Sequence, residues 1–226
     1  MKKNKKVNIL IASILLLTAI ITLCVYPKVP DTVPIHWNFN GEVDSTGPKY
    51  MLFVFLGIAF GANLLMLFAK KIDPKGENYD KFPLVFDITR VFITALLCGM
   101  ELMVIGFAFN PSFADMETIM YLIMGMMFIL LGNYMPKVKR NYTFGIKTPW
   151  TLDNETVWNK THRMAGVLWV IGGVIILFAA FIPAKMALIL MMGVLFLMVI
   201  IPTVYSYIAF KKEKENEANT KKTSDQ

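Results

Sequence analysis

Three polar side chains interrupt long apolar runs of this sequence, namely Asn63, Arg90 and Glu101. Polar and ionisable groups at membrane depth are costly, so they usually pair inside a bundle or line a functional path. Glu101 follows Arg90 by a rise of about 16 Å along a helix, on nearly the same face but too far for an ion pair. A carboxyl at this depth is either a proton, cation or ligand site, or a protonated group bonded to a neighbour such as Asn63. The sequence leaves both interpretations open.

Arg90 has a simpler interpretation, because Asp87 precedes it by one helical turn. Residues three apart face the same side of a helix and can form an ion pair. A long basic side chain near the end of a span can also extend toward the headgroups. We therefore expect Asp87 and Arg90 to form an interfacial anchor.

Few other residues could support catalysis or metal binding. The two histidines, His36 and His162, fall in connections predicted to lie on opposite sides of the membrane. No His-Glu-x-x-His or Gly-x-Ser-x-Gly pattern is present. Cys24 and Cys98 fall at different depths of their runs, which disfavours a disulfide or a metal pair. We expect no enzyme, no catalytic residue, no metal and no cofactor.

The elements that must position these residues are membrane-spanning helices. Hydrophobic residues make up 56% of the 226-residue chain and charged residues only 17%. Six apolar runs each reach the roughly 20 residues that cross a bilayer. The sequence thus predicts an all-α fold, a six-helix bundle in the cell membrane, with a bend at Pro202 in the last span. The six runs are 7–26, 50–69, 84–108, 117–135, 164–183 and 186–209.

The distribution of basic residues predicts the orientation of this bundle. Of the 23 Lys and Arg, all lie on one side of the membrane except Lys28, Lys49, Lys185 and the intramembrane Arg90. The positive-inside rule makes that side cytoplasmic and places both termini there. The net charge of +7 is then a topology signal and a contact for anionic lipid. We expect no direct binding of nucleic acid.

The connections divide the chain into three predicted parts. A two-helix unit with an outer loop domain (27–49) is followed by a four-helix unit with a cytoplasmic loop (136–163), and then by a polar tail that we expect to be disordered. Residues 70–83 are expected to be a connector without chemistry, and Gly57 and Gly61 to mark close helix packing. The three parts are 1–83, 84–210 and 211–226.

The outer loop carries a compact set of recognition side chains. Prolines and glycines punctuate the segment PIHWNFNGEVD, which contains His36, Trp37, Asn38 and Asp44. Large amphipathic rings beside adaptable amides suit recognition of a peptide. The alternative is self-packing, with Trp37 at the membrane interface and its neighbours bonding loop backbone.

The cytoplasmic loop contains a second cluster, GIKTPWTLDNETVW at 145–158, followed by His162 and Arg163. Thr151 or Asp153 is expected to cap a short helix starting near Asn154, with Trp150 and Trp158 anchoring it to the headgroups. A re-entrant element, a phospholipid contact and a docking face for a cytoplasmic protein all fit this pattern. The candidate residues are Gly145, Lys147, Thr148, Pro149, Trp150, Thr151, Leu152, Trp158, His162 and Arg163.

These two loops resemble the SdpI-like toxin-immunity membrane proteins. The run from Gly132-Asn133 through GIKTPWTL to His162-Arg163 is similar to the signature of that family. PIHWN with Gly41, Asp44, Gly47 and Lys49 is similar to the uncharacterised outer-loop domain that often precedes it.

The resemblance implies a bacterial membrane protein that protects its producer from a secreted antimicrobial peptide. It also implies signalling, in which the protein holds a cytoplasmic transcriptional repressor at the membrane. On this interpretation, toxin meets His36, Trp37, Asn38 and Asp44, and the repressor docks on the cytoplasmic cluster. Two other classes remain open: a small-molecule or proton-coupled carrier centred on Glu101, and a structural membrane protein with no ligand.

Overall fold

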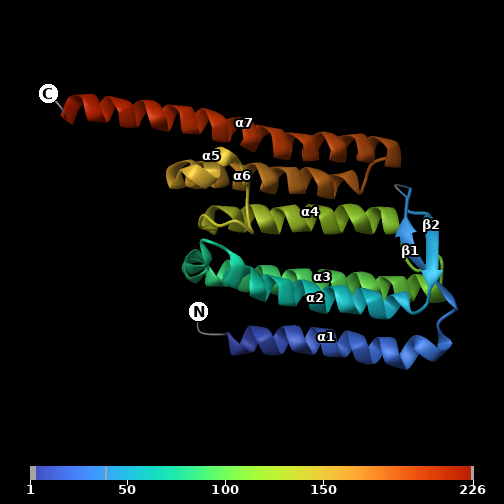
Figure 1. The fold of residues 1–226 in the computed structure, drawn as a ribbon. Helices are drawn as coiled ribbons and strands as arrows, with labels where there is room; N and C mark the ends of the chain where they lie inside the picture. The colour runs from blue at the N-terminus through green and yellow to red at the C-terminus, as the bar shows by residue number, and fades with distance from the viewer. Residues whose placement is uncertain (1–3, 39, 225–226) are drawn as a thin grey trace. The chain divides into compact units, whose positions relative to one another are not determined.

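The computed structural model describes residues 4–38 and 40–224, with the side chains of the last helix described as far as Thr220. Within these residues, six helices are long and apolar enough to cross a membrane (Figure 1). The prediction of six spans in a multi-pass cell-membrane protein is confirmed. The six helices are α1 (Lys5–Val25), α2 (Met51–Ile72), α3 (Pro83–Phe109), α4 (Met116–Tyr134), α6 (Glu155–Ala179) and α7 (Ala184–Ser224).

The chain forms two compact units whose boundary differs from the one expected between residues 83 and 84. Unit 1 contains the chain up to Ile72 together with Pro83–Ile119. Unit 2 contains Asp73–Phe82 and the chain from Met120 onward. The third helix therefore joins the first two, because its buried polar face finds its partners on α1 and α2.

In unit 1, α3 packs against both α1 and α2. A single antiparallel hairpin, β1 (Thr32–Trp37) and β2 (Val43–Pro48), connects α1 to α2 (Figure 1). Its register pairs Val33 with Gly47 and Trp37 with Val43, with irregularities on either side of His36. Such bulges redirect side chains, and here they leave His36 exposed while Trp37 is half-buried.

The base of the hairpin is a small apolar core of unit 1. Val33 and Leu52 are fully buried, and they pack with Val29 and with Val104 and Ile105 of α3. The outer loop is therefore an ordered cap fixed to the ends of the helices rather than a free loop.

Gly57 and Gly61 do not mark a close helix contact, so that expectation is wrong. A Cβ built on either residue meets nothing within 4 Å. Gly57 instead lines an apolar groove between α1 and α2. A pair of small residues permits close approach only where another helix lies opposite it, and here none does.

The close contact between helices lies in unit 2, between α4 and α6. A Cβ on Gly132 would lie 2.7 Å from the carbonyl oxygen of Gly166, and one on Gly125 would lie 2.7 Å from that of Gly173. Gly125 and Gly132 are seven residues apart on α4, and Gly166 and Gly173 are seven residues apart on α6. The two contacts therefore repeat after two helical turns. The absence of side chains at these four positions lets the backbones meet.

The C-terminal segment differs from the expected disordered tail. The structure continues α7 past Phe210 to Ser224, and residues 225–226 lie outside the described residues. The segment is rich in Lys and Glu, which favour helix, and Lys160 of α6 binds Glu213 at 2.8 Å. Helix continuation from a stable span avoids the cost of a new nucleus.

Candidate functional site

Buried polar residues follow one face of α3 in unit 1. Asp87, Arg90, Thr94 and Glu101 are each at most 6% exposed. Their spacings of three, four and seven residues place them on one side of the helix. We call these four residues the polar seam. It runs along the part of α3 that α1 and α2 cover.

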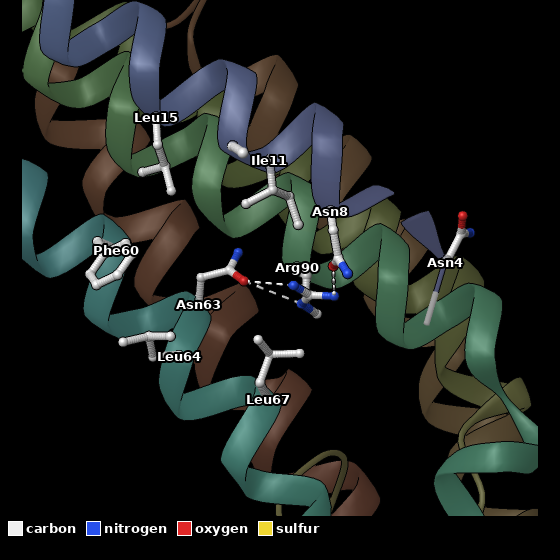
Figure 2. Close-up of a pocket in the computed structure, with 10 residues that line it drawn as sticks. Asn4, Asn8, Ile11, Leu15, Phe60, Asn63, Leu64, Leu67 and Arg90 are labelled. Carbon is white, nitrogen blue, oxygen red and sulfur yellow. Dashed lines mark hydrogen bonds between the residues drawn. The ribbon is translucent and has the colours of Figure 1, made fainter. Parts of the chain in front are cut away.

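The N-terminal half of the seam is organised around the guanidinium of Arg90. Its Nε and Nη2 donate to Oδ1 of Asn63 at 3.3 and 2.8 Å, and its Nη1 donates to Oδ1 of Asn8 at 3.1 Å (Figure 2). Asn63 also donates to Thr94 at 2.7 Å. The expected pair with Asp87 is loose, since Nη1 lies 3.8 Å from Oδ1. Amides of two other helices, rather than the carboxylate, hold Arg90.

The pocket beside Arg90 lies between α1 and α2. It has a volume of about 250 Å³. Figure 2 shows Asn8 and Asn63 on either side of Arg90, with apolar side chains continuing along both helices. The pocket is thus polar at one end and apolar at the other. Its lining residues are Asn4, Asn8, Ile11, Ala12, Leu15, Phe60, Asn63, Leu64, Leu67 and Arg90.

Glu101 forms the other half of the seam and is 1% exposed. Its Oε1 accepts a hydrogen bond from the hydroxyl of Thr22 on α1 at 2.7 Å. The partner suggested from sequence, Asn63, does not bond Glu101; its amide bonds Arg90 and Thr94 instead. Oε2 of Glu101 is buried and has no hydrogen-bond partner.

A second cavity of about 130 Å³ lies where the hairpin meets the helices of unit 1. Glu101 and Trp37 both line it, and the indole Nε1 of Trp37 is also buried without a partner. The other lining residues are apolar: Ile35, Phe55, Ile58, Leu97, Met100, Val104 and Met116. We call this the hairpin cavity. A buried polar atom without a partner costs about 1–3 kcal/mol, and two residues of this cavity each carry one.

The four outer-loop candidates thus separate into three roles. His36 and Asp44 are exposed and contact each other at 2.5 Å. Asn38 closes the turn, since its Oδ1 accepts from the backbone N–H groups of Asn40 and Glu42. Only Trp37 reaches the hairpin cavity.

The candidates of the loop predicted to be cytoplasmic lie in unit 2, where four of the ten are buried. We call these four residues, Thr148, Thr151, Trp158 and His162, the clasp. Trp158 and His162 are fully buried and stacked, with ring centroids 3.9 Å apart. The indole of Trp158 donates to the carbonyl of Val138 at 2.8 Å. The sequence suggested that Trp158 anchors to the headgroups, and this expectation is wrong. Trp150, by contrast, is half-buried against Tyr207.

The tautomer of His162 follows from its two neighbours. Its Nε2 accepts the backbone N–H of Ile146 at 3.0 Å, so Nδ1 carries the proton and donates to the carbonyl of Trp158. Gly145, at φ +94, lies directly beside this ring, and a Cβ there would overlap Nε2. The glycine is required for both its conformation and its lack of a side chain.

The helix caps differ from those expected. Thr148 caps the short helix α5 (Pro149–Asp153) in a capping box with Thr151, and its hydroxyl also contacts Ser206 of α7 at 3.0 Å. Asn154 caps α6 through the N–H of Val157. A helix does start near Asn154, as expected, but Asn154 is its cap, and the expected caps Thr151 and Asp153 are wrong. Both lie inside the separate short helix α5, which begins at Pro149 because proline is preorganised for the first helical position.

Asp73 is a structural centre that the sequence did not reveal, since its segment was expected to be a plain connector. Its Oδ2 accepts from the hydroxyl of Tyr79 and the N–H of Tyr142, both at 2.8 Å, and from the hydroxyl of Thr143. Burial raises the pKa of Asp73, but these bonds and one from the N–H of Lys75 outweigh it and leave the pKa below its usual value. Asp-Pro at the start of a polar turn was the available signal.

These observations define a multi-pass membrane protein whose first unit holds a polar seam and an ordered hairpin cap. Its second unit holds the loop at 136–163, which we call the motif loop, with the buried clasp. Residues 137–206 match the SdpI/YfhL protein family, and residues 13–60 match a domain of unknown function, DUF1648. The chain is also similar to the immunity protein SdpI of Bacillus subtilis (strain 168), at 27% identity over 94% of this chain and 98% of the relative. No solved structure matches.

The family resemblance seen in the two loops is therefore confirmed as a similarity: residues 137–206 are similar to the SdpI/YfhL family, and the chain as a whole is similar to an immunity protein. The matched ranges correspond to the two site regions: one covers most of α1, the hairpin and the first half of α2, and the other covers the motif loop with α6 and the first half of α7.

Proposed function

We propose that this protein gives its bacterium immunity to a secreted antimicrobial peptide by binding that peptide at the hairpin end of unit 1. The proposal rests on the similarity to an immunity protein and on the hairpin cavity. It places the hairpin outside the cell and both termini in the cytoplasm. The role is binding and not catalysis.

The unsatisfied pair in the hairpin cavity carries this proposal. Nε1 of Trp37 can only donate, and both this atom and Oε2 of Glu101 are buried without a hydrogen-bond partner, on two residues that line the same cavity. A volume of about 130 Å³ admits one small or medium side chain. A peptide group that both accepts and donates, such as an amide or a hydroxyl, would satisfy both atoms at once.

The exposed residues of the hairpin supply the rest of the surface. His36 with Asp44 and Asn38 with Glu42 form two polar pairs next to the half-buried Trp37. Such an arrangement, an aromatic anchor surrounded by polar groups, is typical of a peptide-binding hot spot. The core at the hairpin base holds the surface in place before the peptide arrives, which lowers the entropy cost of binding.

Survival of a sensitive bacterium tests the proposal. The strain expresses the protein and is challenged with candidate antimicrobial peptides, including any toxin encoded next to its gene. Protection should fall at least tenfold when His36, Trp37 and Asn38 are all changed to Ala. Ser112→Ala, an exposed change in the connection between α3 and α4, is the matched control and should retain protection. Full protection by the triple variant at unchanged membrane abundance would contradict the proposal.

We further propose that the signalling role, if this chain has one, uses the exposed members of the cytoplasmic cluster. Lys147, Pro149 and Arg163 are exposed, whereas Thr148, Thr151, Trp158 and His162 are buried in the clasp. A repressor can touch the exposed set, to which Gly145 also belongs, and the half-buried Trp150 and Leu152, but not the clasp. Co-purification of the repressor with membranes should fall with Lys147→Glu and Arg163→Glu, and should persist with Lys185→Glu, a change predicted to lie on the opposite side of the membrane.

A further inference from the structure

A long groove between α1 and α2 is separate from the hairpin cavity. The pocket beside Arg90 shares Ala12, Leu15 and Phe60 with a larger apolar pocket of about 520 Å³. The two are therefore continuous, and we call them together the α1–α2 groove. Its apolar part is lined by Ala12, Leu15, Leu16, Ala19, Phe53, Leu56, Gly57 and Phe60.

The polar end of the groove carries the guanidinium of Arg90, which is loosely paired with Asp87. Arg90 has five N–H donors, and three of them are used by Asn8 and Asn63. Asp87 lies 3.8 Å away, beyond hydrogen-bond reach, and it does not line the groove. No Asp or Glu is among the lining residues of either pocket. Arg90 can thus still donate to an anion that enters from the side of the bundle.

Basic residues of unit 1 surround the same end. Lys5 and Lys6 begin α1, and Lys70 and Lys71 lie in the last turn of α2. Because α1, α2 and α3 are consecutive antiparallel spans, both pairs of lysines fall at the end of unit 1 where α3 begins, about two helical turns before Arg90. An anion arriving there meets a positive field before it meets the buried guanidinium.

The length of the groove matches one lipid leaflet. From Asn8 to Ala19 a helix rises by about 16 Å, and half of a hydrocarbon core of about 30 Å is about 15 Å. The polar end lies at the depth of a headgroup, and the apolar end near the middle of the bilayer. An amphipathic molecule with an anionic head and an acyl chain fits both properties.

We propose that the α1–α2 groove is a binding site for one anionic phospholipid. The phosphate accepts hydrogen bonds from the two remaining N–H groups of Arg90, with the amides of Asn8 and Asn63 beside it. One acyl chain lies along Leu15, Phe60 and the surface left open by Gly57. The bound lipid fills the space between α1 and α2 that no side chain occupies. This inference is independent of the proposed immunity function.

Native mass spectrometry of the full protein in detergent tests this site with two probes, phosphatidylglycerol and phosphatidylcholine of identical chains. The protein should retain one phosphatidylglycerol with about a tenfold preference over phosphatidylcholine. Arg90→Gln should remove the preference. Lys70→Gln with Lys71→Gln is the control for surface charge and should leave most of the preference in place.

A second variant keeps the test valid if Arg90→Gln fails to fold. Leu15→Trp fills the apolar part without changing charge, and should reduce retention of both lipids. Leu17→Trp is its matched control, because Leu17 is 60% exposed on the same helix and does not line the groove. Equal retention of the two lipids, loss of the preference only in the lysine variant, or unchanged retention in Leu15→Trp would each overturn the proposal. So would a change in oligomer mass with no change in bound lipid, since the groove would then be covered by a second copy of the chain.

Discussion

The indole N–H of Trp169 on α6 donates a hydrogen bond of 3.2 Å to the backbone carbonyl of Met198 on α7. This carbonyl is the one that Pro202, four residues later, leaves without its helical donor. A buried or lipid-facing carbonyl without a partner is costly. Trp169 therefore compensates for the proline, and α7 continues past it.

This compensation predicts the effect of Trp169→Phe. The substitution keeps a ring against Phe128, which Trp169 contacts edge-on, but removes the donor. We expect the free energy of unfolding to fall by about 1 kcal/mol. In a Pro202→Ala background the helix supplies its own donor, so the same substitution should cost much less. Equal costs in both backgrounds, measured by denaturation in mixed micelles, would refute the compensation.

The glycine contact between α4 and α6 predicts a strong effect of Gly132→Ala. A methyl group there would lie 2.7 Å from the carbonyl oxygen of Gly166 and 2.8 Å from the backbone nitrogen of Val170, neither of which can move freely. The two helices would have to move apart, and this should lower the free energy of unfolding by about 2 kcal/mol or more. Gly61→Ala is the control, since it meets nothing within 4 Å and should be neutral or slightly stabilising. Thermal stability in detergent gives the comparison.

Asp73 predicts a pH dependence of unit 2. Because its pKa is lowered in the folded protein from the ordinary 3.8, its contribution is fully present above that value and is lost as the pH falls through the folded pKa. Asp73→Asn should cost about 2 kcal/mol at neutral pH, as loss of charge-assisted hydrogen bonds does. The difference between the two proteins should shrink below about pH 4. A gap that stays constant down to pH 3 would show that the charge of Asp73 does not matter.

Substitutions of Glu101 distinguish a role in peptide recognition from a role in transport. Glu101→Gln keeps an acceptor for Thr22 and a polar group in the hairpin cavity, so protection should stay within about tenfold of the original. Glu101→Leu removes both and should abolish protection at equal membrane abundance. A carrier that needs an ionisable group would lose activity with either substitution. Abolished protection in Glu101→Gln would therefore favour the carrier.

The spans could be predicted because twenty apolar residues in a row have few alternatives in a bilayer. Burial of Arg90 and Glu101 on one face of α3 followed from their spacing. Their partners did not, since Asn8 and Thr22 lie on another helix and nothing in their own neighbourhood marks them. The same limit applies to the glycines: Gly57 and Gly61 have the familiar spacing, but the contact is made at Gly132 and Gly166.

The two loops show a different limit. Their composition predicted ordered, turn-rich segments, and the hairpin and the clasp are ordered. Composition did not indicate which side chains face inward. Trp37 is half-buried and Trp158 fully buried because bulges and a new helix start turn them inward, and such local shifts depend on contacts distant in sequence.

The segment Asp73–Phe82 lies in sequence between two helices of unit 1, yet it is part of unit 2. The polypeptide therefore passes from one unit to the other and back before the motif loop is made. A gene truncated to encode only the residues after Ile119 would lack the carboxylate that holds Tyr142 and Thr143. A fragment that begins after Ile119 should therefore be stable only together with a fragment that contains Asp73–Phe82. An exchange of the second half between relatives would have to include this short segment.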